Sequence, residues 1–329
     1  MRRKSPRELA LAFTAAILLC GTSQAAEKYP SKPITLVSPL AAGAVTDVVT
    51  RAWMNCASAD SLAGQPFVLT NRPGANGVVA AAFMRQQVSD GYTLQVSGMS
   101  QTTITPFIFK KPPYDPEKEF QGAAMFAVSP FTLVASADSG IKSVGDLIAY
   151  AKSRKGGIDI GIPAIASPAQ LLSAAVAAKL DIPASLVPLS GEAGGISALL
   201  GGQVPVMIFL TGSAKPYIDS GKLVALMNFT DKRMPSMPDV PTSTEVLHDP
   251  SFARTAWIGI TTRAGTPADV VHSIDAWTKA CLDNPEFVET LTKASFTPHY
   301  VPAAEYADVV HRDIEFWRPW IQRLGISND

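Results

Sequence analysis

The stretch Ile34-Thr-Leu-Val-Ser-Pro-Leu-Ala-Ala-Gly-Ala-Val-Thr-Asp47 places a strand, a turn of small residues and the start of a helix in direct succession. The first N–H groups of a helix have no intrahelical partner, and the helix dipole favours negative charge there. The small residues Ala41–Ala44 let a ligand approach that backbone closely. The turn therefore predicts either an anion site, for example for a small carboxylate, or only the first strand-to-helix connection of an α/β domain.

The chain continues this alternation of short apolar runs with helical patterns. Runs rich in β-branched and aromatic residues, separated by helical segments, are typical of strand–helix–strand units with mostly parallel sheets. The sequence therefore predicts an α/β fold with strands at Ile34 to Ser38, Phe67 to Thr70, Tyr92 to Ser97, Phe131 to Ser136, Ile158 to Gly161, Leu186 to Leu189, Val206 to Leu210, Leu223 to Asn228 and Trp257 to Thr262.

Several helix boundaries are marked by a capping side chain followed by proline, whose fixed φ suits the first helical position. This pattern occurs at Ser167-Pro168, Thr266-Pro267 and Asn284-Pro285. Helices are also predicted from Pro168 to Leu180 and from Ala303 to Leu324, the latter with a kink at Pro319. The proline-rich segment from Asp231 to Pro241 predicts an irregular surface connection.

The N-terminus has the layout of a secretory signal peptide. Basic residues come first, an apolar run from Leu9 to Cys20 follows, and Ser23 and Ala25 form a small-x-small cleavage pair. The run is too short for a spanning helix, which needs about 20 residues. Residues 1–25 are therefore predicted to be removed on export to the periplasm.

The mature chain is long and not basic. Removing 25 of the 329 residues leaves 304, a length that favours two domains. It retains 24 of 28 basic and 27 of 28 acidic residues, a net charge near −3, which provides no basic face for nucleic acid. Cys56 and Cys281 remain, and the sequence leaves open whether they pair or stay as buried thiols.

Catalytic and metal-binding motifs are not found in the sequence. The histidines His248, His272, His299 and His311 are scattered, without a second His or Cys at a ligand spacing. There is no Gly-x-Ser-x-Gly elbow, phosphate loop or dinucleotide fingerprint. The sequence therefore predicts a protein that is not an enzyme and needs no metal or cofactor.

A set of short motifs follows in a fixed order along nearly the whole mature chain: Tyr29-Pro-Ser-Lys-Pro-Ile34, Pro39-Leu-Ala-Ala-Gly43 with Asp47 and Arg51, Asn71-Arg-Pro-Gly74 with Gly77, Asp90-Gly-Tyr-Thr-Leu94, Pro113-Tyr-Asp-Pro116 with Phe120, Leu200-Gly-Gly-Gln-Val204, Pro238-Asp-Val-Pro-Thr242 with Glu245, Trp257 with Gly259, and Ala264-Gly-Thr-Pro267. In their order and spacing the chain resembles the Bug family of TctC-like proteins, the periplasmic solute receptors of tripartite tricarboxylate transporters.

The resemblance implies an α/β, type II periplasmic binding protein of the Venus-flytrap kind, with two Rossmann-like domains and two interdomain crossovers. Lobe 1 would comprise residues 27–128 plus 253–329, and lobe 2 residues 129–252. A small organic carboxylate would bind in the cleft through loop amides, and the closed monomer would deliver it to the membrane subunits of the transporter. Two alternatives remain: a periplasmic sensing subunit of a signalling system and, less favoured, an exported enzyme.

The implied ligand-binding positions lie on the opening turn, on the turn before the helix at Pro168 and around Gly191: Leu40, Ala41, Ala42, Gly43, Ala44, Val45, Asp47, Ala164, Ala166, Ser167, Gln170, Ser190, Gly191 and Phe209. Asp47 would repel an anion, so it is expected to orient the loop or to meet an amino or hydroxyl group. Ser167 is expected either to cap its helix or to contact the ligand directly, and Gln170 either to offer its amide to the ligand or to be an exposed polar helix position.

The chain departs from the family pattern around this cleft. Ala44 stands where a second glycine is usual, Leu189 and Ser190 replace a Tyr-Lys pair, Gln170 replaces a histidine, and Pro205 replaces an aspartate. These changes suggest a ligand less charged or more apolar than citrate, with Leu189, Phe209 and Leu210 as an apolar wall.

Overall fold

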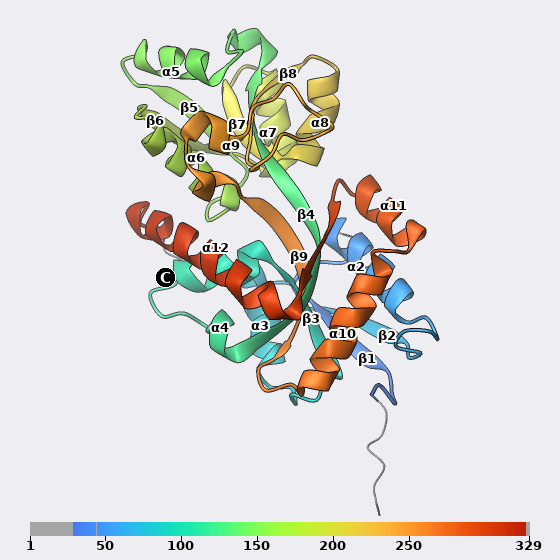
Figure 1. Cartoon of the computed structure of the whole chain (residues 1–329). Coiled ribbons are helices and arrows are strands. Elements are labelled where there is room, and N and C mark those ends of the chain that lie inside the picture. Colours follow the sequence, from blue (N-terminus) through green and yellow to red (C-terminus); the bar gives the residue numbers. More distant parts are fainter. Residues whose placement is uncertain (1–28, 44, 327–329) are drawn as a thin grey trace, which may run out of the picture.

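The computed structural model describes residues 29–43 and 45–326. Two α/β bodies lie one above the other, connected by the long strand β4 (Phe120–Ser136) and by β9 (Thr255–Arg263) (Figure 1). The predicted signal peptide, residues 1–25, and Ala44 lie outside the described residues. Within those residues, no helix combines the length and apolar character that a membrane span requires.

The lower body in Figure 1 is built on a mixed sheet of order β2-β1-β3-β9-β4, and β10 pairs with β4. β1 is parallel to β2 and β3, whereas β9 is antiparallel to both β3 and β4. The bounds of the remaining strands in this body are β1 Ile34–Ser38, β2 Phe67–Asn71, β3 Thr93–Gly98 and β10 Thr297–Pro302.

The upper body is built on the second half of β4. Up to Pro130, β4 pairs with β9, and from Phe131 onward it pairs with β7 and β8 instead. β5 then pairs in parallel with both β7 and β6. A single strand thus belongs to both sheets, and the strands of this body are β5 Ile158–Ile162, β6 Ala184–Pro188, β7 Val206–Leu210 and β8 Leu223–Asn228.

Helices cover both sheets. The lower body carries α2 Val45–Ala57, α3 Val78–Met84, α4 Pro116–Glu119, α10 Ala268–Cys281, α11 Pro285–Lys293 and α12 Ala303–Arg323, and the upper body carries α5 Val144–Lys152, α6 Pro168–Lys179, α7 Gly191–Leu200, α8 Thr211–Asp219 and α9 Ser243–Leu247. Short turns complete the chain: η1 Ala75–Gly77, η2 Ser100–Ile104, η3 Thr105–Ile108, η4 Ala137–Ser139 and η5 Pro250–Phe252.

Aromatic side chains and a disulfide hold the lower body together. Trp53 and Phe126 stack with ring centroids 6.4 Å apart, and the buried indole N–H of Trp53 donates to Thr278 Oγ1 at 3.2 Å. Cys56 of α2 and Cys281 of α10 form a disulfide across 225 residues, with Cα atoms 5.8 Å apart. Cys56 and Cys281 are therefore paired, a point that the sequence left open. Their disulfide joins the C-terminal ends of two helices that pack on each other.

Most strand predictions are confirmed, but two expectations are wrong and two strand segments were missed. The sheets are mixed and not mostly parallel, because β9 and the long β4 run against their neighbours. β10 and the first half of β4 were not predicted. The helix α10 begins at Ala268 and is not capped by Thr266, whose hydroxyl instead donates to Arg263 O at 2.7 Å.

A C-terminal helix is present where it was predicted, and the kink expected at Pro319 stays a prediction. α12 continues through Pro319 as one helix, with Trp317 fully buried and Trp320 partly buried against the same core. The segment from 231 to 241 is irregular, as predicted.

Candidate functional site

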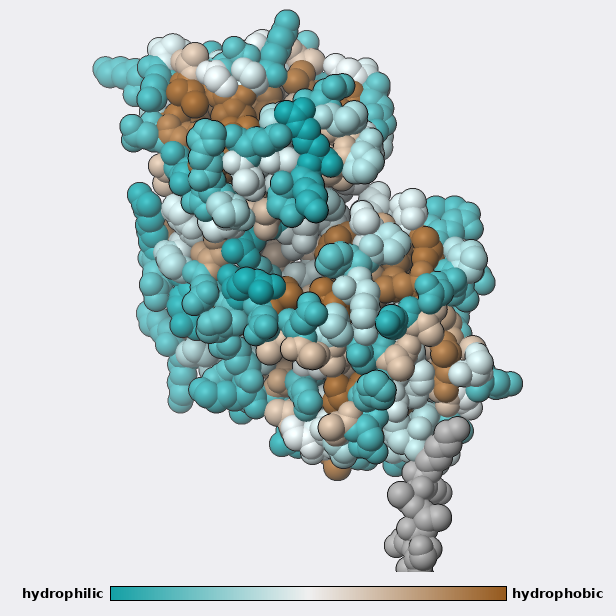
Figure 2. All heavy atoms as spheres, in the orientation of Figure 1, coloured by the Kyte–Doolittle hydropathy of each residue, from teal (hydrophilic) through white to brown (hydrophobic). Residues whose placement is uncertain are grey.

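A cavity of about 260 Å³ lies between the two bodies. Figure 2 shows a notch in the molecular surface at the same level. The lower body contributes Pro39, Leu40, Thr46, Phe296 and the run from Val96 to Gln101, the upper body contributes Pro163, Ser167, Pro168, Ala169, Glu192 and Leu210, and the connecting strands contribute Phe131, Ala256, Trp257 and Ile258. We refer to this cavity as the cleft.

The opening turn is held in place by Asp47. One carboxylate oxygen, Oδ2, accepts the Gly43 N–H at 3.1 Å and Arg51 Nε at 3.0 Å, and Oδ1 accepts Asn71 Nδ2 at 3.1 Å. The same Asn71 amide donates to Leu40 O at 2.9 Å. Asp47 is only 3% exposed and does not line the cleft, so it orients the loop, which is one of the two roles expected for it.

Burial raises the pKa of the Asp47 carboxyl, but the donors around it outweigh burial. Asn71, the Gly43 N–H and Arg51 together hold the pKa below its ordinary value. Asp47 is therefore ionised at neutral pH. The turn residues Ala41, Ala42 and Gly43 are exposed and stand in the chain between Leu40 and Thr46, which line the cleft, and Gly43 has a φ of 83° that favours glycine.

The second predicted turn precedes α6 and is tied by its own side chains. Ser167 Oγ accepts the Gln170 N–H at 3.2 Å and donates to Ala164 O at 2.7 Å, which makes it the N-cap of α6. Gln170 Oε1 accepts the Ala166 N–H at 2.7 Å, so this oxygen supports the turn. Ser167 also lines the cleft, whereas Ala164, Ala166 and Gln170 do not.

The third predicted turn presents a carboxylate that the sequence reasoning missed. Ser190 and Gly191 are exposed at the start of α7 and do not line the cleft, but the next residue, Glu192, does. Its Oε1 accepts the Leu210 N–H at 3.4 Å, and its Oε2 accepts Ser213 Oγ. The only sequence signal for Glu192 was that it is charged and directly follows Gly191, a predicted contact.

The expectation for Phe209 is wrong. Phe209 is 1% exposed and packs with Met207 in the core of the upper body, where it also faces Gly195. Its neighbour Leu210 lines the cleft instead, because successive residues of β7 point to opposite faces of the sheet. Leu210 is therefore the member of the proposed apolar wall that the structure brings to the cleft.

The sequence reasoning also missed the lower-body wall that follows β3. This wall runs from Gly98 through Met99 and Ser100 to Gln101, and η2 begins there as a π-helical turn, a geometry that is frequent at functional sites. The Gln101 side chain packs so tightly that a Cβ at Gly77 would lie 2.6 Å from it. A run of polar residues directly after a strand is the signal that could have identified this wall.

Trp257 lines the cleft and is fixed by a buried ion pair. Its indole N–H donates to Asp313 Oδ2 at 2.8 Å, and Arg254 Nη1 donates to Asp313 Oδ1 at 2.8 Å. Burial raises the pKa of Asp313, which Trp257 and Arg254 partly offset. The Trp257 ring also meets Tyr306 edge-on at 5.6 Å. Through Trp257, the lining of the cleft is thus anchored to α12.

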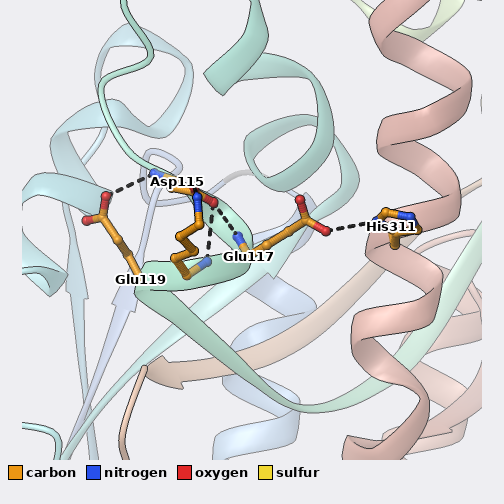
Figure 3. Close-up of polar contacts among 5 residues, drawn as sticks. Asp115, Glu117, Glu119 and His311 are labelled. Atoms are coloured by element: carbon orange, nitrogen blue, oxygen red, sulfur yellow. Dashed lines mark hydrogen bonds and ion pairs between the residues drawn. The ribbon is translucent and has the colours of Figure 1, made fainter.

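A larger cavity, about 700 Å³, lies within the lower body between its sheet and α12. Polar side chains on the central strands and α12 line it, among them Gln95, Ser97, Thr261 and Tyr306. At its rim Glu117 of α4 and His311 of α12 point toward each other, with 3.0 Å between His311 Nδ1 and Glu117 Oε1 (Figure 3). The Glu117 and Glu315 carboxylates raise the pKa of His311.

The cleft is a better candidate for the ligand-binding site than the larger cavity of the lower body. The larger cavity is lined by residues of the lower body alone, whereas the cleft is formed by both bodies and by the strands that connect them. The N-terminal turns of two helices line the cleft. Thr46 belongs to the first turn of α2, and Ser167 to Ala169 form the start of α6. Such helix ends suit a carboxylate.

The lining of the cleft is almost entirely uncharged. Among residues 29–43 and 45–326, no group of three or more His, Cys, Asp or Glu side chains is arranged to hold a metal ion. The described lining of the cleft contains a single ionisable side chain, Glu192, and the rest is apolar, hydroxyl or amide.

Comparisons with known proteins identify the architecture. Residues 51–326 match the model of the family described as the tripartite tricarboxylate transporter family receptor, TctC. The periplasmic binding protein BugD is 26% identical, with 91% of this chain and 99% of BugD covered and a TM-score of 0.71. The two-lobe α/β fold predicted from the sequence, that of a periplasmic binding protein, is thereby confirmed.

Two similar structures carry bound acids. Rpa4515 of R. palustris, solved with adipate, is 26% identical, with 91% of this chain and 99% of that chain covered and a TM-score of 0.74. MatC of Rhodopseudomonas palustris, solved with malate, is 27% identical, with 89% and 100% covered and a TM-score of 0.70. The chain therefore belongs to the TctC family of periplasmic receptors of tripartite tricarboxylate transporters, which are solute-binding proteins and not enzymes.

Proposed function

We propose that this protein binds a small organic carboxylate in the cleft and delivers it to the membrane subunits of a tripartite tricarboxylate-type transporter. The observation that carries the proposal is the convergence of the α2 and α6 N-termini, one from each body, on a single cavity. The unpaired N–H groups of a first helical turn stabilise a carboxylate without a positively charged side chain. The acids bound by the two Rhodopseudomonas proteins support the same ligand class.

Closure of the two bodies on the ligand provides the mechanism. We assign lobe 1 to residues 27–128 plus 253–329 and lobe 2 to residues 129–252, and the change of β4 pairing partners after Pro130 supports this division. A ligand that contacts both lobes stabilises the closed form over the open one, so binding shifts the population toward closure. The transporter then distinguishes loaded from empty receptor by shape.

The remaining predicted contacts belong to this closed form. Closure would bring the exposed backbone of Ala41–Gly43, with Ala44 and Val45, toward the ligand from lobe 1. From lobe 2 it would bring Ala164, Ala166 and the turn at Ser190 and Gly191.

The partners and the compartment follow from the same proposal. Residues 1–25 direct export, and the mature receptor works in the periplasm as a monomer that meets the transporter transiently. No cofactor is required, because recognition uses backbone amides, hydroxyls and apolar contacts.

A thermal-shift screen tests the proposal. Residues 26–329 are unfolded, freed of carried-over ligand, refolded with the disulfide intact and heated with aliphatic, aromatic and amino acids. An acid at a hundredfold excess over its dissociation constant adds about 2.7 kcal/mol to the free energy of unfolding and raises the midpoint. A midpoint that no carboxylate raises would refute carboxylate binding.

A further inference from the structure

The cleft contains an acid of its own. Glu192 is the only ionisable side chain among the described residues that line the cleft, and it is half-buried there. The two residues before Gly191 are Leu189 and Ser190, so the turn itself supplies no positive charge. A receptor for carboxylates thus presents a carboxylate to its ligand.

Glu192 occupies the N-terminus of a neighbouring helix. Leu210, whose N–H donates to Glu192 Oε1 at 3.4 Å, is the N-cap residue of α8, and Ser213, which donates to Oε2, lies in the first turn of α8. An acidic group at a helix N-terminus satisfies the positive end of the helix dipole. The positive N-terminus of α8 is therefore already neutralised from within the protein.

The helix N-termini around the cleft consequently differ in charge preference. The first turns of α2 and α6 face the cavity, and the one acidic side chain among them, Asp47, is buried away from the cleft and held by three donors. At the N-terminus of α8, Glu192 has one protein donor per oxygen, and each carboxylate oxygen can accept a second bond. The described lining offers no Lys, Arg or His to supply it.

We infer that Glu192 determines specificity: the ligand carries one carboxylate, which the α2 and α6 ends bind, and a hydrogen-bond donor at its other end, which Glu192 accepts. An ammonium group satisfies Glu192 best, because it also balances the charge. A second carboxylate is placed against Glu192 and is repelled. The inference rests on the proposed function and narrows its ligand class from carboxylates in general to amino-bearing monocarboxylates.

Titration calorimetry with ligands of matched length tests the inference. For chains of three, four and five carbons, the straight monoacid, the diacid and the ω-amino acid are titrated into the refolded wild-type protein. At the best-fitting length we expect the ω-amino acid to bind at least tenfold more tightly than the diacid. Diacids that bind as tightly as ω-amino acids at every length would overturn the inference.

The variant Glu192→Gln should reverse the preference for the ω-amino acid over the diacid. It keeps an oxygen for the Leu210 N–H and removes the charge, so we expect the diacid to gain at least tenfold and the ω-amino acid to lose at least tenfold, with the monoacid changed less than threefold. The matched control is Glu289→Gln, whose side chain on α11 is 63% exposed and paired with Lys293. This control should leave every affinity unchanged.

The outcomes separate the two proposals. An unchanged ranking in Glu192→Gln, with the same denaturation midpoint as wild type, shows that Glu192 only caps α8 and overturns the inference. If Glu192→Gln fails to fold, the wild-type ranking alone decides. Failure of every acid to bind either protein contradicts the proposed function itself.

Discussion

Replacing Asp47 with alanine removes the group that fixes the opening turn. The carboxylate is 4% exposed and accepts from Gly43, Arg51 and Asn71. A hydrogen bond to a charged group contributes about 1.5–3 kcal/mol and a neutral one about 1 kcal/mol. Arg51 is 53% exposed, so its pair with Asp47 contributes at most about 1 kcal/mol. Because the released donors partly reach water, the expected loss in the free energy of unfolding is about 2–4 kcal/mol.

Asp47→Ala should also weaken ligand binding. With Gly43 and Asn71 released, the backbone that faces the cleft must be ordered by the ligand, so we expect binding of the cognate acid to weaken at least tenfold. Denaturant titration measures the free energy of unfolding and calorimetry measures affinity. Glu289→Ala serves as the control, because its pair with Lys293 is exposed to solvent and is expected to add little to stability.

The pH dependence of Asp47 gives an independent check. The folded pKa lies below the ordinary value of 3.8, so the ionised carboxylate stabilises the fold above that value. The contribution falls as pH drops through the folded pKa. The stability difference between wild type and Asp47→Asn should therefore be full at neutral pH and shrink in acid. A variant Asp47→Ala with wild-type stability and affinity would refute the account of the loop.

Further predictions concern other parts of the frame. Reducing Cys56–Cys281, or replacing both with alanine, should lower the free energy of unfolding by about 2–5 kcal/mol, measured by denaturant titration with and without reductant. Ser167→Ala should cost about 0.5–2 kcal/mol through loss of the α6 cap and weaken acid binding in calorimetry; unchanged affinity would contradict a role for this turn. Arg254→Met leaves Asp313 buried without its cation, so stability should fall by about 3–5 kcal/mol at neutral pH and recover in acid as Asp313 is protonated, which a pH series of unfolding curves would show.

The sequence predicted the strands with strong local signals and missed those that depend on neighbours. The segment Phe120–Pro130 contains glycine and several alanines, which favour strands weakly, and it is a strand because β9 and β10 pair on its two sides. The strand β10 contains Pro298 and Pro302, which are tolerated at a sheet edge. Neither segment has a recognisable pattern of its own.

The sequence predicted the backbone turns of the candidate site better than the side chains that line it. The turns at Ala41–Gly43 and at Ser167 were found because small residues and caps mark them. The side chains that face the cleft depend on register: Phe209 and Leu210 are adjacent, and one step along β7 moves a side chain from the cleft to the core. Glu192 was missed because its direction depends on Ser213, 21 residues later.

The crystal structure of the mature protein with the tightest-binding acid tests the central claim most directly. The account predicts the ligand carboxylate between Thr46 of α2 and Ala169 of α6, within hydrogen-bond distance of first-turn N–H groups, with the two lobes closed on it. An acid bound instead in the lower-body cavity beside Gln95 and Tyr306, with the cleft empty, would contradict it.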